Sequence, residues 1–104
     1  ETLANDAEAP PLYRDLAVLK SVIVGAGATS PDERIAKLAP IQQPGNPYRL
    51  LALEQRAFAE VEQGNNAAAI ETLTGILADA EVTEGLRRRA TQLIVALGGA
   101  LDQG

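Results

Sequence analysis

The sequence predicts an all-α protein built from repeated helix–turn–helix units. Apolar residues recur at helical spacing in five segments, and matching residues reappear 35 positions apart. No stretch of the sequence alternates polar and apolar residues in the manner of a strand. The apolar residues are mostly leucine, isoleucine, valine and alanine, and aromatic residues make up only 3% of the 104 residues. Because alanine loses no side-chain entropy in a helix, this composition also favours helices.

The first helix is expected to run from Pro10-Pro11 to Gly25-Ala26-Gly27. Proline is tolerated in a first helical turn because its missing amide would lack a partner there. The apolar stripe of this helix consists of Leu12, Leu16, Leu19 and Ile23. Residues 1–9 are polar and acidic without a period, so we expect a flexible lead-in followed by one helical domain over residues 10–104.

The start of the second helix is the clearest local signal in the chain. Ser30 can cap it, Pro31 occupies the first helical position, and Glu33 can reach back to complete a capping box. The acids Asp32 and Glu33 also suit a helix N-terminus. Pro44-Gly45 ends the segment. Its narrow apolar stripe consists of Ile35, Leu38 and Ala39.

Asn46-Pro47 repeats the pattern of a cap followed by proline, and a third helix is expected from there to about Gln63. Its broad apolar face is predicted to contain Leu50, Leu51, Leu53, Ala57, Phe58 and Val61. Glu60 and Glu62 are predicted to face solvent.

Two more helices are expected after Gly64. Asn65 or Asn66 can cap the fourth helix, which ends near Asp79. Its apolar positions are Ile70, Leu73, Ile76 and Leu77. Thr83-Glu84 begins the fifth helix, which Gly98-Gly99 ends. Its apolar stripe consists of Leu86, Ala90, Leu93 and Leu97.

An offset of 35 residues aligns the chain with itself. It superimposes residues 13–17 on 48–52, Ile35 on Ile70, and Leu38 on Leu73. A helix pair with this period cannot bury its apolar face alone and stacks on its neighbours, which predicts a solenoid. Two pairs and a capping fifth helix would fill the chain. The alternative is a five-helix bundle whose short similarities arise by chance.

The segment Gly64-Asn65-Asn66-Ala67-Ala68-Ala69-Ile70, seven residues after Ala57, resembles the turn and small-residue pattern of tetratricopeptide repeats. Leu53 and Arg56 depart from that pattern, which usually has bulky apolar residues there. More narrowly, residues 11–17 and 46–54 resemble the C-terminal half of a bacterial family that includes the ancillary subunit of the Sec translocon. This resemblance implies a membrane-anchored protein at the periplasmic face of the inner membrane, which binds proteins near the translocon or its chaperones.

Composition excludes several classes of function. The chain has no Cys, His or Met, which removes thiolate nucleophiles, histidine bases and the common zinc sites, so we expect no catalysis and no cofactor. A net charge of −5 disfavours nucleic acid as a partner. No apolar run reaches about 18 residues, so we expect no membrane contact by this segment itself. Because the chain begins with Glu1, we expect it to be a piece of a longer protein.

Glu54 is the residue whose chemistry disagrees with its position, because it falls in the middle of the apolar face of the third helix. A carboxylate there needs a cation or a hydrogen-bond donor. One reading is an internal ion pair with Arg89, which flanks the stripe of the fifth helix. The other is a ligand-binding acid in a groove formed by the first helices of stacked pairs. The run Arg87-Arg88-Arg89 cannot form one basic patch, because consecutive helix residues point about 100° apart. These arginines are expected to be solvated or paired with acids such as Glu81 and Glu84.

These observations predict a non-enzymatic scaffold that binds other proteins or peptides. The expected contact surface lies around Leu51, Glu54, Phe58 and Glu62, with Arg89 beside it. Two alternatives remain at this point. The exposed ends of a short array could pair with a second copy to form a homo-oligomer, or the chain could be a helical accessory domain of a larger enzyme.

Overall fold

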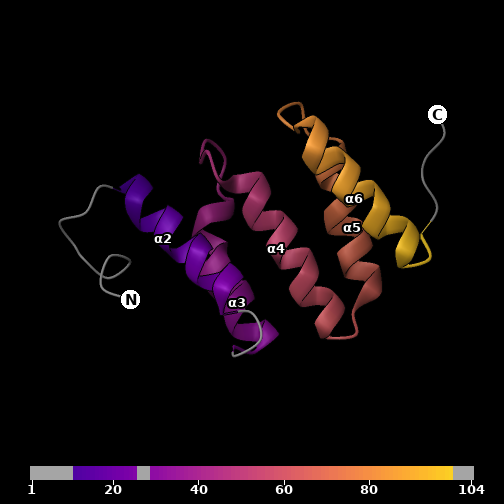
Figure 1. Cartoon of the computed structure of the whole chain (residues 1–104), viewed down its shortest axis with the longest axis horizontal. Coiled ribbons are helices and arrows are strands. Elements are labelled where there is room, and N and C mark those ends of the chain that lie inside the picture. The colour runs from indigo at the N-terminus through magenta and orange to yellow at the C-terminus, as the bar shows by residue number, and fades with distance from the viewer. Residues whose placement is uncertain (1–10, 26–28, 100–104) are drawn as a thin grey trace.

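A computed structural model describes residues 11–25 and 29–99, and every regular element in these ranges is helical. The predicted lead-in at residues 1–9 lies outside the described residues. The elements in chain order are α2 (Pro11–Val24), α3 (Pro31–Leu38), a 3₁₀ turn η1 (Ala39–Gln42), α4 (Arg49–Glu62), α5 (Asn66–Leu77) and α6 (Glu84–Ala96). They succeed one another across the molecule, with α4 between α2–α3 and α5–α6 (Figure 1). The all-α class is therefore confirmed.

Three of the predicted helix starts are confirmed by their caps. Ser30 Oγ accepts a hydrogen bond from the Glu33 amide at 3.1 Å, and Glu33 Oε1 accepts one from the Ser30 amide at 3.3 Å. Asn65 caps α5 by accepting from the Ala68 amide, and Thr83 caps α6 in the same way. Each cap satisfies an amide that would otherwise lack a partner in the first turn.

The predicted start of the third helix is wrong. α4 begins at Arg49 after an N-cap at Tyr48, which makes no side-chain capping bond. Asn46 caps the preceding turn instead: its Oδ1 accepts from the Tyr48 amide at 2.8 Å, and its Nδ2 donates to Asp15 Oδ2 of α2 at 2.7 Å. Asparagine readily forms such a turn with the amide two residues ahead, and Pro47 fits inside it. Asn46 therefore ties this loop to α2.

The 35-residue offset is visible in the backbone. α3 begins at Pro31 and α5 at Asn66, while α4 begins at Arg49 and α6 at Glu84. Both starting pairs are thus 35 residues apart. Leu38 and Leu73, which the offset superimposes, are both fully buried. The period in the sequence therefore corresponds to a period in the helices.

The apolar side chains form two clusters. The C-terminal cluster joins α4, α5 and α6 and contains Ala57, Ala69, Leu73, Ile76, Leu86, Ala90 and Ile94. The N-terminal cluster joins α2, α3, η1 and α4 and contains Leu19, Val22, Leu38, Ile41 and Ala52. α4 contributes to both clusters, so it is packed on two sides.

Two predicted core positions are wrong in the N-terminal half. Ile23 is 49% exposed, because α2 turns Val22 inward beside the predicted Leu19. Ala39 is exposed and Ile41 is buried. The 3₁₀ turn explains the second difference: with three residues per turn, η1 places Ile41 on the same side as Leu38.

The predicted apolar face of α4 is also partly wrong. Leu51 and Phe58 are 41% and 39% exposed, whereas the fully buried positions of this helix are Ala52, Ala57 and Ala59. A helix with neighbours on two sides is buried along both flanks and keeps only a narrow stripe open. Small residues on those flanks let α3 and α5 approach closely. The stripe between the flanks is the candidate site.

Candidate functional site

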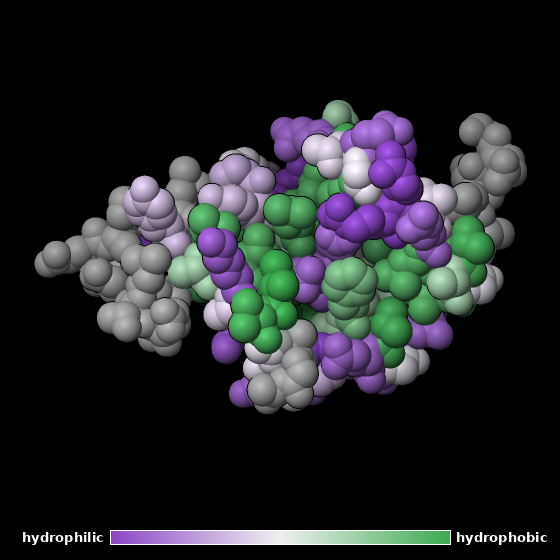
Figure 2. Space-filling view, viewed as in Figure 1, coloured by the Kyte–Doolittle hydropathy of each residue, from purple (hydrophilic) through white to green (hydrophobic). Residues whose placement is uncertain are grey.

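Four of the predicted site residues lie on one stripe of α4. Leu51, Glu54, Phe58 and Glu62 are spaced by three, four and four residues, which places them on one side of a helix. Leu51 and Phe58 are exposed, and Glu54 is 5% exposed between them. We call these four residues the α4 stripe. Figure 2 shows apolar side chains gathered across the middle of the face on which α2 and α4 run.

Arg89 of α6 holds Glu54 with two parallel hydrogen bonds. Arg89 Nε lies 2.7 Å from Glu54 Oε2, and Arg89 Nη2 lies 3.0 Å from Glu54 Oε1. The predicted ion pair is therefore confirmed. The side chain of Arg89 remains 53% exposed, while the hydrogen bonds and the charge of Glu54 raise the pKa of this arginine. The pair satisfies a buried carboxylate and joins α4 to α6 at positions 35 residues apart.

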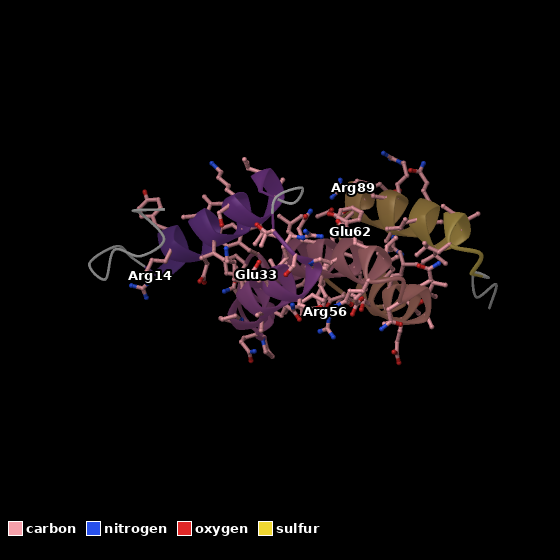
Figure 3. The ribbon with its side chains drawn as sticks, turned by 90° about the horizontal axis from the view of Figure 1, so that it is seen from below. Arg14, Glu33, Arg56, Glu62 and Arg89 are labelled. Atoms are coloured by element: carbon pink, nitrogen blue, oxygen red, sulfur yellow. The ribbon has the colours of Figure 1, made fainter. Side chains whose placement is uncertain are left out.

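Glu62 at the other end of the stripe pairs with Arg34 of α3. Arg34 Nη2 lies 2.5 Å from Glu62 Oε2, and Arg34 Nη1 donates to the carbonyl of Thr29. Arg34 is 2% exposed, and sequence reasoning missed it. Its spacing of four residues from Leu38 was the available signal, because that spacing puts both residues on the buried face of α3. Glu62 and Arg89 lie on the same side of the molecule, opposite Arg56 (Figure 3).

The prediction that Glu60 faces solvent is wrong. Glu60 is 4% exposed, because it follows Ala57 by three residues on the flank of α4 that faces α5. It accepts from Arg56 Nε at 3.0 Å and from the hydroxyl of Thr72 on α5 at 2.8 Å. Arg56 also donates to Gln42 of η1 at 3.1 Å. This network joins three elements and has a structural role.

Arg49 at the start of α4 binds the loop before α6. Its Nη1 lies 2.7 Å from Asp79 Oδ2, and its Nη2 lies 3.3 Å from Glu81 Oε1. Glu81 was suggested as a partner of the arginines at 87–89, and it pairs with Arg49 instead. The hydrogen bond from Arg49, followed by one from the Glu81 amide, lowers the pKa of Asp79.

We expect Asp79→Asn to destabilise the protein near neutral pH and to have little effect in acid. A carboxyl group whose pKa is lower in the folded state contributes stability above its unfolded pKa, near 3.8, and loses it as the pH falls through the folded value. The difference in urea midpoint between wild type and variant should therefore be full well above the unfolded pKa of Asp79, near 3.8, and should shrink as the pH falls below it. A difference that is independent of pH would contradict this role for Asp79.

A cleft of about 350 Å³ adjoins the stripe between the N-terminal ends of α4 and α6. Leu51 belongs to both the stripe and the cleft. The other residues that line the cleft are Asn46, Pro47, Arg49, Leu50, Glu81, Thr83 and Leu86. An apolar group of a partner that binds over Leu51 would therefore also enter this cleft.

The described residues contain no group of three acids placed to hold a metal ion. Within the same ranges no helix has both the length and the apolar character needed to cross a bilayer. Comparison of the chain with protein-family models, with curated proteins and with solved structures found no match in any of the three. The proposal of function therefore rests on the exposure and the ion pairs of the residues in the α4 stripe.

Proposed function

We propose that this chain is a non-enzymatic protein-binding module that holds other proteins or peptides on the α4 stripe. The observation that carries the proposal is the exposure of Leu51 and Phe58 on either side of the Glu54–Arg89 pair. Large apolar residues seven positions apart on one helix lie roughly 10 Å apart along its axis. Exposed apolar side chains that lie close together and are rimmed by charge are typical of protein-interaction sites.

The charges around the stripe suit a binding site more than a catalytic one. Glu54 and Glu62 are each paired with an arginine. Pairs of this kind at an interface restrict which partner can dock, whereas buried apolar contacts supply most of the affinity. Leu51 and Phe58 would be the anchors in such a contact.

A tetratricopeptide-like solenoid is the architecture we propose for the module. It is supported by the 35-residue spacing of helix starts and by helices that pack on their neighbours in chain order. Stacked helix pairs create extended surfaces that suit protein ligands. A location at the periplasmic face of the inner membrane belongs to the same proposal and rests on sequence resemblance alone.

A comparison of two baits tests the proposal. The purified chain and a Leu51→Ser/Phe58→Ser variant would each be used to retain proteins from the native extract, and retained proteins would be quantified. Because both side chains are about 40% exposed, we expect the variant to melt close to the wild type. At least one protein should be retained by the wild type and lost by the variant, and should then bind the purified wild type in titration calorimetry.

A matched control is Glu71→Ser, which changes an exposed residue of α5. It should retain the same proteins as the wild type. If the stripe variant and the control retain identical proteins in equal amounts, the α4 stripe is not a binding surface.

A further inference from the structure

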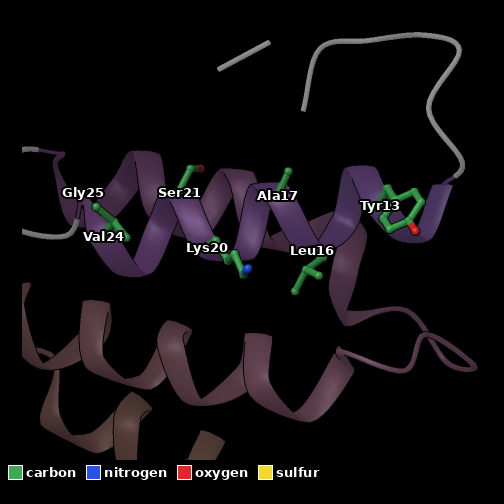
Figure 4. A pocket seen from close by; sticks show the side chains of 7 residues that line it. All are labelled: Tyr13, Leu16, Ala17, Lys20, Ser21, Val24 and Gly25. Carbon is green, nitrogen blue, oxygen red and sulfur yellow. The ribbon is translucent and has the colours of Figure 1, made fainter. Parts of the chain in front are cut away.

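The outward face of α2 is open although it has the character of a packed helix face. Tyr13 is 59% exposed and Val24 is 86% exposed. These residues line a shallow hollow of about 460 Å³ that runs along the helix (Figure 4). The hollow is lined mainly by Tyr13, Leu16, Ala17, Lys20, Ser21 and Val24, which we call the α2 face.

The internal repeat shows what covers the equivalent face of α4. The 35-residue offset superimposes Ala17 on Ala52 and Ser21 on Arg56. Ala52 is fully buried in the N-terminal cluster with Leu38 and Ile41 of α3–η1. Arg56 donates to Gln42 of η1. Leu16 is superimposed on Leu51, which stays 41% exposed on the α4 stripe. The flank of α4 that corresponds to Ala17 and Ser21 is therefore covered by the helix and 3₁₀ turn that precede it.

The inward face of α2 fits the same comparison. The offset superimposes Val22 of α2 on Ala57 of α4. Val22 is buried in a cluster with α3, and Ala57 is buried in a cluster with α5, which in each case is the next helix in the chain. α4 is thus packed on both flanks, whereas among the described residues α2 is packed on one. No element that the structure describes covers the flank of α2 that corresponds to the flank of α4 under α3–η1.

The outer face of α6 at the other end of the array is more polar, although it includes Val95, which is 56% exposed. Leu53 and Ala57 of α4 pack toward α5, and the offset superimposes them on Arg88 and Gln92 of α6. Both of these polar residues are exposed. A polar outer face is what closes the end of a solenoid. Among the described elements, α6 therefore ends the stack, and α2 leaves it open.

We propose that the α2 face binds one amphipathic α-helix of a partner protein, in the way that α3–η1 covers α4. Such a helix would present two apolar residues three positions apart, as Leu38 and Ile41 are, toward Ala17. It would also present an acid to Lys20, which is exposed and pairs with no carboxylate among the described residues. A second copy of this chain fits less well, because two α2 faces would bring two Lys20 ammonium groups together without an acid. This surface is separate from the α4 stripe, so either proposal can fail alone.

The test uses the sequence of α3–η1 itself as the probe. A fluorescent peptide of residues 29–44 would be titrated with the purified chain and followed by anisotropy. We expect a Kd on the order of 100 μM, because so short a helix buries far less than the roughly 1,200 Å² of a stable complex. Val24→Glu should weaken binding about tenfold or more, because it places a carboxylate in the hollow. The Val24→Glu variant should fold, because Val24 is exposed, and so should the control variant at Ile23, which is also exposed.

The matched control is Ile23→Glu, which adds the same charge one residue away and outside the hollow. It should leave the Kd within about twofold of wild type. No binding up to about 2 mM peptide would overturn the proposal. If the peptide binds the Val24→Glu variant as tightly as the wild type, the proposal is also overturned. The peptide would then have bound in place of α3 and not on the α2 face. Sedimentation that shows a dimer abolished by Val24→Glu would assign the face to a second copy instead.

Discussion

Leu73→Ala is expected to lower the free energy of unfolding by about 2–5 kcal/mol. Leu73 is fully buried at the centre of the C-terminal cluster, where α4, α5 and α6 meet. Truncation removes apolar contacts on every side and leaves a cavity that three packed helices cannot readily close. This is a large share of the roughly 5–15 kcal/mol that stabilises a domain, so the variant should be only marginally folded. Urea unfolding followed by circular dichroism measures the change.

Leu38→Ala provides the internal comparison because the offset superimposes this residue on Leu73. Leu38 is also fully buried, but its cluster has fewer members, so its cost should fall toward the lower end of the same range. Glu71→Ala on the exposed side of α5 should change stability by less than about 0.5 kcal/mol. A cost below about 1 kcal/mol for Leu73→Ala would contradict the packing of α4, α5 and α6 around this residue.

Arg89→Ala is expected to destabilise the protein by about 1–3 kcal/mol, because it leaves the carboxylate of Glu54 buried without its partner. Glu54 is 5% exposed, so water cannot replace both hydrogen bonds that Arg89 donates. The cost stays below that of a deeply buried pair because Arg89 itself is half exposed. Arg89→Lys should recover only part of the loss, because an ammonium group cannot form the two parallel bonds.

Glu54→Leu is the matched variant for this pair. It removes the buried charge and fills the site with an apolar side chain, so the fold should persist with little loss of stability. A double-mutant cycle between Glu54→Leu and Arg89→Ala isolates the interaction, because Arg89→Ala should cost little once the carboxylate is gone. A melting curve that Arg89→Ala leaves unchanged would contradict a structural role for the pair.

Local chemistry allowed much of the fold to be predicted. The caps at Ser30, Asn65 and Thr83 depend only on neighbouring residues, so their helix starts could be predicted from the sequence. The Glu54–Arg89 pair could also be predicted, because a carboxylate in an apolar face needs a partner and the chain offered one beside the stripe of the last helix. The caps and the ion pair could be inferred from helical spacing and side-chain chemistry, without knowing which helices pack against one another.

The errors concern the number of neighbours that each helix has. Phe58 was assigned to the apolar face of the third helix and Glu60 to solvent, whereas Phe58 is 39% exposed and Glu60 is 4% exposed. Helical spacing defines faces, but it does not show that α4 is packed by alanines on two flanks or that the open stripe lies between them. Asn46 was misassigned because asparagine can cap a helix or a turn equally well, and only contact with Asp15 distinguishes the two.

Site-specific photo-crosslinking in the native host tests the central claim, protein binding on the α4 stripe, most directly. A photoreactive phenylalanine analogue at position 58 conserves the aromatic ring of Phe58 and should crosslink a distinct protein when irradiated. The same analogue at position 71, exposed on α5, serves as the control and should not crosslink that protein. Crosslinking at 58 that Leu51→Ser reduces would agree with binding on the stripe. Identical crosslinked products at 58 and 71, or none at 58, would contradict it.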